Sequence, residues 1–415
     1  MLSSRCKQRN TTIIPSLLNQ HDAVLMGNVT TIDLSTAENW LVKGILLDGL
    51  EQAVGGLSKE ALAYSSGIGG CPKTRQWMAS LLNCRFHPAK TVDPSHIVLA
   101  AGGSFALTAL VEQICDPGDG ILIATPYWAG LDISISVHYN ATIIPVHVPL
   151  SEFFRPESVQ YYEIAIENAS VPVKAVLLCN PHNPLGQCYP REALQGMLEF
   201  CQRRNLHYIS DEVYALSAHS PVPVTCTSFI SALQLSTSEI WERIHVIYSL
   251  SKDFGCSGIR VGALITQNND AIRLSCALSV HSQVSSVSTT LAAQAILYPE
   301  MVQKICGQGG KRLQEAYQLI SSFLDGHGID YVPVAYGMFV FAKLGMGNMV
   351  DVQERNLLSH LKAVGVSVST GTSYHFKELG WFRICYGVPP GQLREGLRRI
   401  QLGLENFAKD ESEHN

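Results

Sequence analysis

The middle of the chain alternates short apolar runs with longer amphipathic stretches. Short apolar runs bounded by turn residues are typical of buried strands, and amphipathic stretches between them are typical of covering helices. Alternation of this kind over some two hundred residues predicts a mainly parallel sheet with helices on both faces. The predicted strands are Ile97–Ala101, Ile121–Ala124, Ala141–Val146, Ala175–Leu178, His207–Ser210, Ile244–Tyr248 and Val261–Ile265.

Beyond Ser285 the pattern changes to long helical stretches, and then to a smaller mixed region that ends in an acidic tail expected to fray. The fold class expected is therefore α/β, with a large domain and a smaller α+β domain built from both chain ends. The predicted division is 1–60 for the N-terminal arm and part of the small domain, 61–300 for the large domain and 301–415 for the rest of the small domain. The elements expected after Ser285 are helix Ala292–Leu324, strand Gly337–Ala342, helix Val352–Val364, strands Val366–Ser369 and Trp381–Cys385, helix Gly391–Phe407 and tail Lys409–Asn415.

Composition narrows the class of protein. At 415 residues with 46% hydrophobic and 16% charged residues, the chain resembles a globular enzyme and not a disordered polymer. A net charge of -5 gives no reason to expect nucleic acid or an anionic membrane as a partner. The twelve cysteines form no CxxC pair and no zinc-ligand spacing, which indicates a reducing compartment. Because there is also no secretory leader and no apolar run of membrane-spanning length, we expect a cytoplasmic protein.

Candidate chemistry begins at Lys252. It follows the strand Ile244–Tyr248, stands between small hydroxyl residues, and is followed eight positions later by Arg260. A lysine can form a Schiff base with an aldehyde when its amine is unprotonated, which burial and nearby cations favour by lowering its pKa. Most lysines that follow a strand are simply solvated, so this stretch needs support from the rest of the chain.

That support comes from the ends of other predicted strands, where an open α/β sheet binds its ligands. Gly103 and Ser104 open a helix whose free N–H groups could hold a phosphate. Trp128 could stack on a planar ring, although an aromatic core residue is an equal alternative. Two Asn-Pro pairs surround His182, which we expect to support the loop, and leave the Asn183 amide free to donate to an oxygen of phenolate type.

Charged residues complete the candidate site. Asp211 could pair with a protonated pyridine nitrogen, and Tyr214 follows it one helical turn later. Arg383 could bind a substrate carboxylate bidentately, with a surface strand arginine as the alternative. Glu38 follows Ser35 and Thr36, either of which could cap a helix N-terminus. Two roles are therefore open for the Glu38 carboxylate, which could stabilise that N-terminus or face the substrate.

Taken together, these motifs resemble the fold-type I pyridoxal-phosphate (PLP) enzymes of aminotransferase class I/II, over nearly the whole chain. Asn183-Pro184-x-Gly186, Asp211-x-x-Tyr214, Ser249-x-Ser251-Lys252 and Arg260 follow the family order. The resemblance is greatest to the 1-aminocyclopropane-1-carboxylate (ACC) synthase branch, through Ala37-Glu38-Asn39, Thr125-Pro126-Tyr127, Ser249-Leu250-Ser251-Lys252-Asp253 and Gly380-Trp381-Phe382-Arg383.

The resemblance implies PLP as cofactor, Lys252 as the Schiff-base amine and proton carrier, and Asp211 as the partner of the ring nitrogen. It implies that Asn183 and Tyr214 contact the ring hydroxyl, that Trp128 stacks on the ring, and that Arg383 and Glu38 bind substrate. The phosphate ligands implied are Gly103, Ser104, Phe105, Ser249, Ser251 and Arg260. This chain departs from the branch at Phe105, where a hydroxyl residue is common. It also departs at Tyr64–Arg75, the counterpart of a compact segment with a catalytic tyrosine, which is longer and glycine-rich here.

The function expected is a carbon–sulfur lyase that acts on a sulfur-substituted amino acid, either a sulfonium like S-adenosylmethionine or a cysteine conjugate. An aminotransferase is the alternative, because both reactions begin with removal of the α-proton. A catalytically silent binding protein on the same scaffold is a third hypothesis, which an intact Lys252 disfavours. The resemblance also implies a homodimer in which Tyr64 reaches the neighbouring subunit's site.

Overall fold

The computed structural model describes residues 1–12, 14, 31–65, 67–222, 226–235 and 240–414. Its centre is a seven-stranded sheet in the order β2-β8-β7-β6-β5-β3-β4, in which β8 runs antiparallel to both neighbours and the other adjacent pairs are parallel. The mainly parallel sheet predicted from the sequence is confirmed, with bounds shifted by one or two residues. The strands are β2 (Ile97–Ala100), β3 (Gly120–Thr125), β4 (Thr142–His147), β5 (Val173–Cys179), β6 (His207–Asp211), β7 (Ile244–Ser249) and β8 (Gly262–Ile265).

The period-two alternation of the strands explains why both sheet faces are covered. In β5, Ala175 and Leu177 join one apolar cluster, whereas Val176 and Leu178 join the cluster on the other face. One face carries α5 (Gly103–Ile114) and α10 (Asp270–Ser279). The other carries elements that include α4 (Pro72–Arg85) and α8 (Arg191–Arg204). A sheet buried on both sides therefore positions chemistry only at its strand ends.

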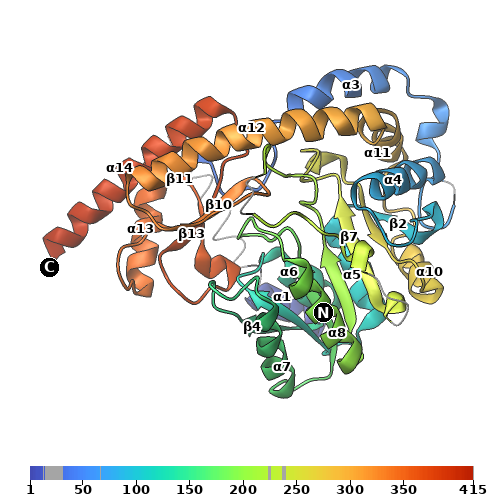
Figure 1. Cartoon of the computed structure of the whole chain (residues 1–415), viewed down its shortest axis with the longest axis horizontal. Coiled ribbons are helices and arrows are strands. Elements are labelled where there is room, and N and C mark those ends of the chain that lie inside the picture. The colour runs from blue at the N-terminus through green and yellow to red at the C-terminus, as the bar shows by residue number, and fades with distance from the viewer. Residues whose placement is uncertain (13, 15–30, 66, 223–225, 236–239, 415) are drawn as a thin grey trace.

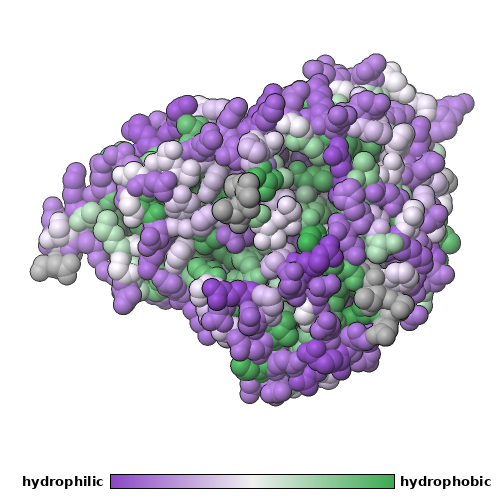
Figure 2. Space-filling view, viewed as in Figure 1, coloured by the Kyte–Doolittle hydropathy of each residue, from purple (hydrophilic) through white to green (hydrophobic). Residues whose placement is uncertain are grey.

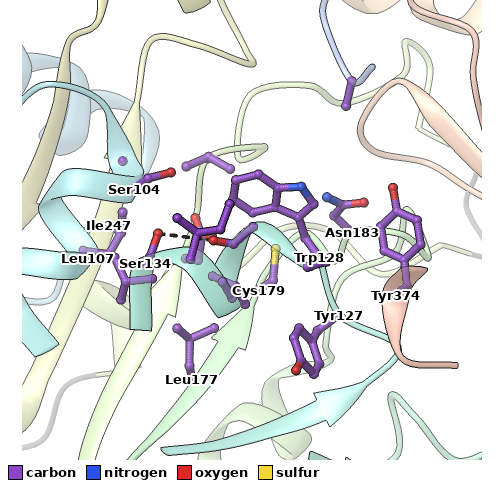
Figure 3. Close-up of a pocket in the computed structure, with 18 of the residues that line it drawn as sticks. Ser104, Leu107, Tyr127, Trp128, Ser134, Leu177, Cys179, Asn183, Ile247 and Tyr374 are labelled. Atoms are coloured by element: carbon purple, nitrogen blue, oxygen red, sulfur yellow. Dashed lines mark hydrogen bonds between the residues drawn. The ribbon is translucent and has the colours of Figure 1, made fainter. Parts of the chain in front are cut away.

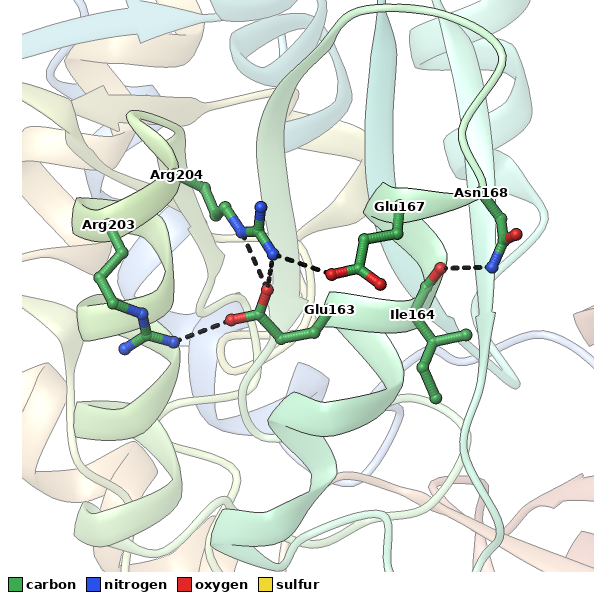
Figure 4. Close-up of polar contacts among 6 residues, drawn as sticks. All are labelled: Glu163, Ile164, Glu167, Asn168, Arg203 and Arg204. Atoms are coloured by element: carbon green, nitrogen blue, oxygen red, sulfur yellow. Dashed lines mark hydrogen bonds and ion pairs between the residues drawn. The ribbon is translucent and has the colours of Figure 1, made fainter.

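The outer edge of the large domain is held by surface charge. The helix α7 (Val159–Glu167) packs beside α8, and Glu163 accepts hydrogen bonds from Arg203 and Arg204 in the last turn of α8 (Figure 4). Cations in a last helical turn also interact favourably with the helix dipole. These pairs lie on the outside of the domain, and the two arginines precede β6, the strand that ends at Asp211.

The small domain combines the segment around β1 with the C-terminal part of the chain, as expected, whereas α1 (Ser4–Thr12) lies against the large domain, where Arg9 donates to the Val137 carbonyl oxygen. The N-terminal strand β1 (Ile32–Asp33) pairs in parallel with β11 (Val366–Ser367). A four-stranded antiparallel sheet lies beside it in the order β12-β13-β10-β9. In Figure 1 this domain lies to the left of the large one, and α12 runs along the top of both. The elements are β9 (Tyr331–Val332), β10 (Phe339–Lys343), β12 (Ser369–Thr370), β13 (Trp381–Cys385), α12 (Pro299–Gly326), α13 (Asp351–Ala363) and α14 (Pro390–His414).

Three local details differ from the sequence pattern or decide between its alternatives. The predicted helix 292–324 is interrupted, because Pro299 begins a new helix after a π-helical turn at Ala292–Ile296. The acidic tail does not fray, because α14 continues to His414 and Asp410 pairs with His360 of α13 over 2.9 Å. No helix begins at Ser35, since α3 (Lys43–Gly55) starts later and the Ser35 amide donates instead to the Asp33 carboxylate over 2.7 Å.

The predicted boundaries at 60 and 300 stay predictions. The helix α3, which precedes the first of them, contributes Ile45 and Leu46 to the large-domain core. The helix α12 crosses the second, and its residues divide between the two cores, with Met301 in one and Leu324 in the other. Within the described part of the chain, no helix combines the length and the apolarity that crossing a bilayer requires.

Candidate active site

A cavity of about 920 Å³ opens where the small domain meets the carboxyl ends of the strands. Figure 2 shows apolar side chains in the hollow middle of this face, inside a mostly hydrophilic rim. Eleven residues predicted from the sequence line the cavity. They are Gly103, Ser104, Trp128, Asn183, Asp211, Tyr214, Ser249, Ser251, Lys252, Arg260 and Arg383.

Lys252 is half-buried just beyond the end of β7, and its Nζ donates a hydrogen bond to the Ala37 carbonyl oxygen over 2.7 Å. Desolvation of the amine, followed by the positive charge of Arg383, lowers its pKa to about 8. Such an amine loses its proton far more readily than a solvated lysine, which is the condition that Schiff-base chemistry sets.

Asp211 ends β6 in the floor of the same cavity. Its Oδ1 is buried and has no hydrogen-bond partner within the described structure. Burial raises the pKa of this carboxyl to about 6, while the Val213 amide and the charge of Lys252 lower it. A buried carboxylate oxygen without a donor is costly, so the site has a place for a cationic N–H group. A protonated pyridine nitrogen, as in PLP, fits that place.

A second part of the cavity suits a phosphate. The first amides of α5 point out of the helix N-terminus at Gly103 and Ser104, and the hydroxyls of Ser249 and Ser251 lie 2.8 Å from each other beside it. Arg260 lies at the same end of the helix, where it donates to the Ala101 carbonyl over 2.8 Å. Amide, hydroxyl and guanidinium donors converge here, as a dianion requires.

Two glycines make this convergence possible. Gly102 has φ +97, and a Cβ there would lie 2.5 Å from Nη2 of Arg260. A Cβ on Gly262 would lie 2.4 Å from the carbonyl carbon of Gly102. Both contacts are shorter than any side chain tolerates, so the close approach of Arg260, β8 and the α5 N-terminus depends on glycine.

Arg383 lies on the small-domain side of the cavity, buried at 4% exposure. Its Nη1 donates to Asn183 Oδ1 over 3.1 Å, its Nη2 donates to the Ser35 carbonyl, and its Nε has no partner. Within the described chain, no carboxylate oxygen lies within ion-pair distance of this guanidinium. A buried cation without a counter-ion provides a site for a carboxylate ligand.

Aromatic side chains form the remaining walls. The indole of Trp128 lies across the cavity, between Ser104 on one side and Asn183 and Tyr374 on the other (Figure 3). Tyr214 is buried against Phe339, with ring centroids 5.2 Å apart. His182 also lines the cavity but packs among aromatic rings, and burial lowers its pKa to about 3. It is therefore neutral, in line with the supporting role expected of it.

Three residues of the predicted site do not line this cavity. The side chain of Phe105 stands on the outside of α5, where it packs against His138. Glu38 pairs with Lys43 over 2.9 Å and accepts from Ser257, which itself lines the cavity, so its carboxylate is engaged away from the ligand space. Tyr64 is 92% exposed on the surface of this chain.

Several lining residues were missed from the sequence. Ser35, Thr36 and Ala37 reach the cavity from the N-terminal segment, and Tyr374 reaches it from the small domain. Ala37 belongs to the motif Ala37-Glu38-Asn39, but nothing local indicates that this segment or Tyr374 meets the strand ends, because the domains meet only in the folded chain. A partial signal existed for Tyr127 and Asp132, which stand on either side of Trp128.

Comparison with known proteins gives a consistent result. A family model for aminotransferase class I and II matches residues 32–400. The chain is 50% identical to the probable aminotransferase tcpI of Claviceps purpurea (strain 20.1), over 99% of this chain and 98% of that protein. It is 32% identical to 1-aminocyclopropane-1-carboxylate synthase 7 of Arabidopsis thaliana, over 80% of this chain and 75% of that protein.

Among solved structures, an aspartate aminotransferase variant of Thermus thermophilus matches with a TM-score of 0.80 at 20% identity, covering 97% of this chain and 99% of that chain. A likeness of this kind concerns the fold. The matched region includes the strands of the large sheet, the small domain and the cavity between the two domains.

Proposed function

The chain belongs to the aminotransferase class I and II family, whose cofactor is PLP, and we propose that it acts as a carbon–sulfur lyase. Its substrate in this proposal is a sulfur-substituted α-amino acid. When bound, PLP withdraws electron density from the α-carbon of an amino acid. The protein's own side chains then have three tasks, which are to hold the cofactor, to hold the substrate carboxylate and to move the α-proton.

Lys252 is the proton carrier in this proposal. Its lowered pKa of about 8 leaves a substantial fraction of free amine near neutral pH, and the hydrogen bond to Ala37 fixes the position of Nζ. Asp211 would stabilise the positive charge of the cofactor ring nitrogen, since its Oδ1 has no other donor. Asn183 and Tyr214 would contact the ring hydroxyl, and Arg260, Ser249, Ser251 and the α5 amides would hold the phosphate.

Arg383 is the observation that carries the substrate assignment. A buried guanidinium with a free Nε and no counter-ion in the described chain would bind the α-carboxylate of an amino acid. Binding there places the α-carbon between Arg383 and Lys252, whose charges are close enough for Arg383 to lower the pKa of the amine. The α-proton would then be removed by Nζ.

The charges of the cavity support a substrate with a neutral substituent. Among the described residues that line it, the positively charged ones are Lys252, Arg260 and Arg383. Each has a task already, in proton transfer, phosphate binding and carboxylate binding. The described part of one chain therefore offers no further cation in the cavity wall for a second carboxylate, as in a dicarboxylic amino donor, whereas a sulfur-bearing substituent needs none. Similarity to ACC synthases supports the sulfur of the substituent and not its neutrality, because a sulfonium was expected from that branch as well.

The reaction has a simple balance. Nζ of Lys252 takes the α-proton, the bond between sulfur and the β-carbon breaks, and the sulfur leaves with the electron pair as a thiol after protonation. Addition of water to the remaining three-carbon fragment yields pyruvate and ammonia. The test is to supply S-benzyl-L-cysteine and S-methyl-L-cysteine to the holoenzyme and to measure thiol, pyruvate and ammonia, which should appear in equal amounts.

An aminotransferase is the second candidate, favoured by the names of relatives at 50% and 42% identity, both probable aminotransferases. Lys252 would take the same α-proton, and the amino group would pass from the amino donor to the 2-oxo acid instead of a leaving group being lost. Supplying an amino donor with a 2-oxo acid distinguishes the two. Stoichiometric amino exchange, with no release of thiol, pyruvate or ammonia from the cysteine conjugates, would establish this candidate and remove the lyase.

We also propose that the enzyme is a homodimer in which Tyr64 reaches the partner's cavity. The phenol is 92% exposed on its own chain, and Ile68 nearby is 64% exposed. Aromatic and aliphatic side chains left open to this extent are typical of surfaces that become covered in an assembly. Light scattering that gives the mass of a single chain at working concentration, with turnover retained, would refute the dimer.

A further inference from the structure

A contact between the two domains lies beside the cavity and has no part in the proposed chemistry. Tyr127 and Asp132 belong to the large domain, on the loop that follows β3, and His375 belongs to the small domain, directly after the helical turn Gly371–Tyr374. The His375 Nε2 lies 2.8 Å from Asp132 Oδ2, and the Tyr127 hydroxyl donates to Asp132 Oδ1 over 2.9 Å. One carboxylate therefore joins side chains of both domains.

Two further contacts hold the same three residues. The rings of Tyr127 and His375 are stacked, with centroids 4.4 Å apart and planes 22° from parallel. The Tyr127 amide donates to the Tyr374 carbonyl oxygen over 3.0 Å. Tyr127 is itself buried. Each contact alone is worth little at a partly exposed site, but together they fix one loop against the other.

The neighbours of this contact explain why it matters for ligand binding. Tyr127 directly precedes Trp128, which crosses the cavity (Figure 3). Tyr374 directly precedes His375, lines the cavity and lies under the guanidinium of Arg383, with Cζ 5.0 Å from the ring centroid. The contact thus connects the wall on the cofactor side to the wall that supports Arg383.

The same residues separate two cavities. Tyr127 and Asp132 line both the main cavity and a second one of about 680 Å³, which His375 also lines. His375 has φ +59, in the left-handed region, so its backbone is held in a conformation that most side chains disfavour. His375 is the C-cap of the turn Gly371–Tyr374, where its amide donates to the Thr372 carbonyl oxygen over 3.0 Å, so the side chain leaves the turn at a fixed position.

We propose that Asp132 and His375 are positioning residues, whose contact holds the Tyr374 loop against the Trp128 loop and thereby places Arg383 for a carboxylate ligand. The inference rests on the proposed function in one respect, which is the assignment of Arg383 to the carboxylate. Neither residue touches the reacting atoms. Loss of the contact should weaken carboxylate recognition while leaving the cofactor amine as reactive as before.

The test uses two probes that differ by a carboxylate. Aminooxyacetate and O-methylhydroxylamine both react with lysine-bound PLP, which is followed by absorbance, but only the first carries a carboxylate. The variants are Asp132→Asn, which keeps an acceptor for Tyr127, and His375→Asn, because asparagine tolerates the left-handed conformation. Glu378→Gln is the control, since it breaks a pair with Lys343 of 2.7 Å within the small domain, three residues from His375.

We expect each variant to weaken the apparent affinity for aminooxyacetate about threefold to tenfold and to leave O-methylhydroxylamine unchanged. The double variant should bind aminooxyacetate no more weakly than the weaker-binding single variant, because both substitutions remove the same contact. Glu378→Gln should match wild type with both probes. Equal changes with both probes, additive effects, or unchanged aminooxyacetate binding in both single variants would overturn the proposal.

The two proposals fail in different ways. If the wild-type holoenzyme reacts with neither probe, the assignment of Lys252 is wrong and the present inference falls with it. The wild type could instead react with both probes while the variants leave its preference for aminooxyacetate unchanged. The assignment of Lys252 would then stand, and the positioning role of Asp132 and His375 would be wrong. Thermal unfolding of each variant with bound cofactor checks that the protein remains folded.

Discussion

The Nζ atom of Lys252 lies 2.7 Å from the carbonyl oxygen of Ala37, so the amine after β7 is held by the segment that follows β1. The two residues are 215 positions apart in the chain. The N-terminal segment thereby contributes to the site through its backbone, and Glu38, the next residue, fixes that backbone by its contacts to Lys43 and Ser257. A residue predicted to face the substrate instead supports the wall of the cavity.

The lowered pKa of Lys252 gives a first prediction. Below about pH 8 the amine is protonated and cannot attack an aldehyde, and above it the free base prevails. We therefore expect the rate at which the cofactor-free protein takes up PLP to rise with pH and to level off above about 8. Stopped-flow absorbance measures this rate. A rate that does not vary with pH across the neutral range would contradict the prediction.

Arg383 should tune this titration, because its charge is the second cause of the lowered pKa. Replacing Arg383 by glutamine removes the cation, so the midpoint of the pH profile should move to higher pH. Arg383→Lys retains a positive charge and serves as the matched control, with a smaller displacement expected. A midpoint unchanged in Arg383→Gln would show that burial alone sets the pKa of Lys252.

The unpaired oxygen of Asp211 gives a second prediction. Asp211→Asn keeps the shape of the side chain but cannot stabilise a cationic ring nitrogen, so kcat should fall about 100-fold or more. Lys252 is unaltered, and the variant should still bind PLP and show the absorbance of the lysine-bound cofactor. A variant that keeps more than a third of wild-type kcat would mean that Asp211 does not pair with the ring.

The glycines of the phosphate site give a third prediction. Gly102→Ala and Gly262→Ala each place a Cβ about 2.5 Å or less from a neighbouring atom, so the α5 N-terminus and Arg260 must separate. We expect PLP affinity to fall at least about tenfold in both. Gly258→Ala is the control, because Gly258 lies in the short helical turn before Arg260 and its Cβ would meet nothing within 4 Å. Fluorescence titration with PLP measures all three, and equal affinities would refute the geometry.

The parts of this site that sequence predicted share one property. Asn183, Asp211 and Lys252 stand at or just beyond the ends of consecutive strands β5, β6 and β7, and parallel strands bring their carboxyl ends to one edge. Local pattern therefore sufficed to collect them. Arg383 was found as well, because its motif lies on a strand of its own, although nothing local indicated which residues surround it.

The parts that sequence missed depend on contacts between distant segments. Tyr374 and His375 reach the cavity because the small domain folds back over the β3 loop, and no periodicity encodes that approach. Phe105 was assigned to the phosphate site through its backbone, which stays a prediction, and its side chain points away from the cavity to His138. Tertiary contact likewise keeps the acidic end of α14 helical.

A histidine pair at the amino ends of β6 and β7, made of half-buried His207 and buried His245, gives a fourth prediction. His207 Nδ1 lies 3.0 Å from His245 Nε2, and His245 Nδ1 lies 3.1 Å from the Thr266 hydroxyl. Burial lowers the pKa of His207 from 6.5 to about 4 and lowers that of His245 well below its ordinary value. Below pH 6.5 these histidines therefore bind protons in the unfolded chain but not in the folded chain. The free energy of unfolding falls as the pH falls below 6.5.

The size of this effect can be measured by urea unfolding of the holoenzyme at pH 7 and pH 5. The shift of His207 alone corresponds to a loss on the order of 2 kcal/mol between these conditions. His207→Gln retains hydrogen-bonding capacity without a titration in this range, so the variant should lose less stability on acidification than wild type. Equal losses in the two proteins would assign the acid sensitivity to other groups.

Tyr64 gives the last prediction, because its exposure on one chain leaves two explanations. If the phenol acts in the partner's cavity, a subunit carrying Tyr64→Ala has an intact Lys252 and lacks only what its partner supplies. A Lys252→Ala subunit has the complementary defect. A hybrid of the two therefore contains one site with both residues, and co-expression through differently tagged subunits should recover activity that neither homodimer shows. If Tyr64 acted in its own chain, or on no site at all, the hybrid would show no recovery beyond that of the parents. The purified hybrid thus distinguishes catalysis across an interface from a tyrosine that merely lies on the surface.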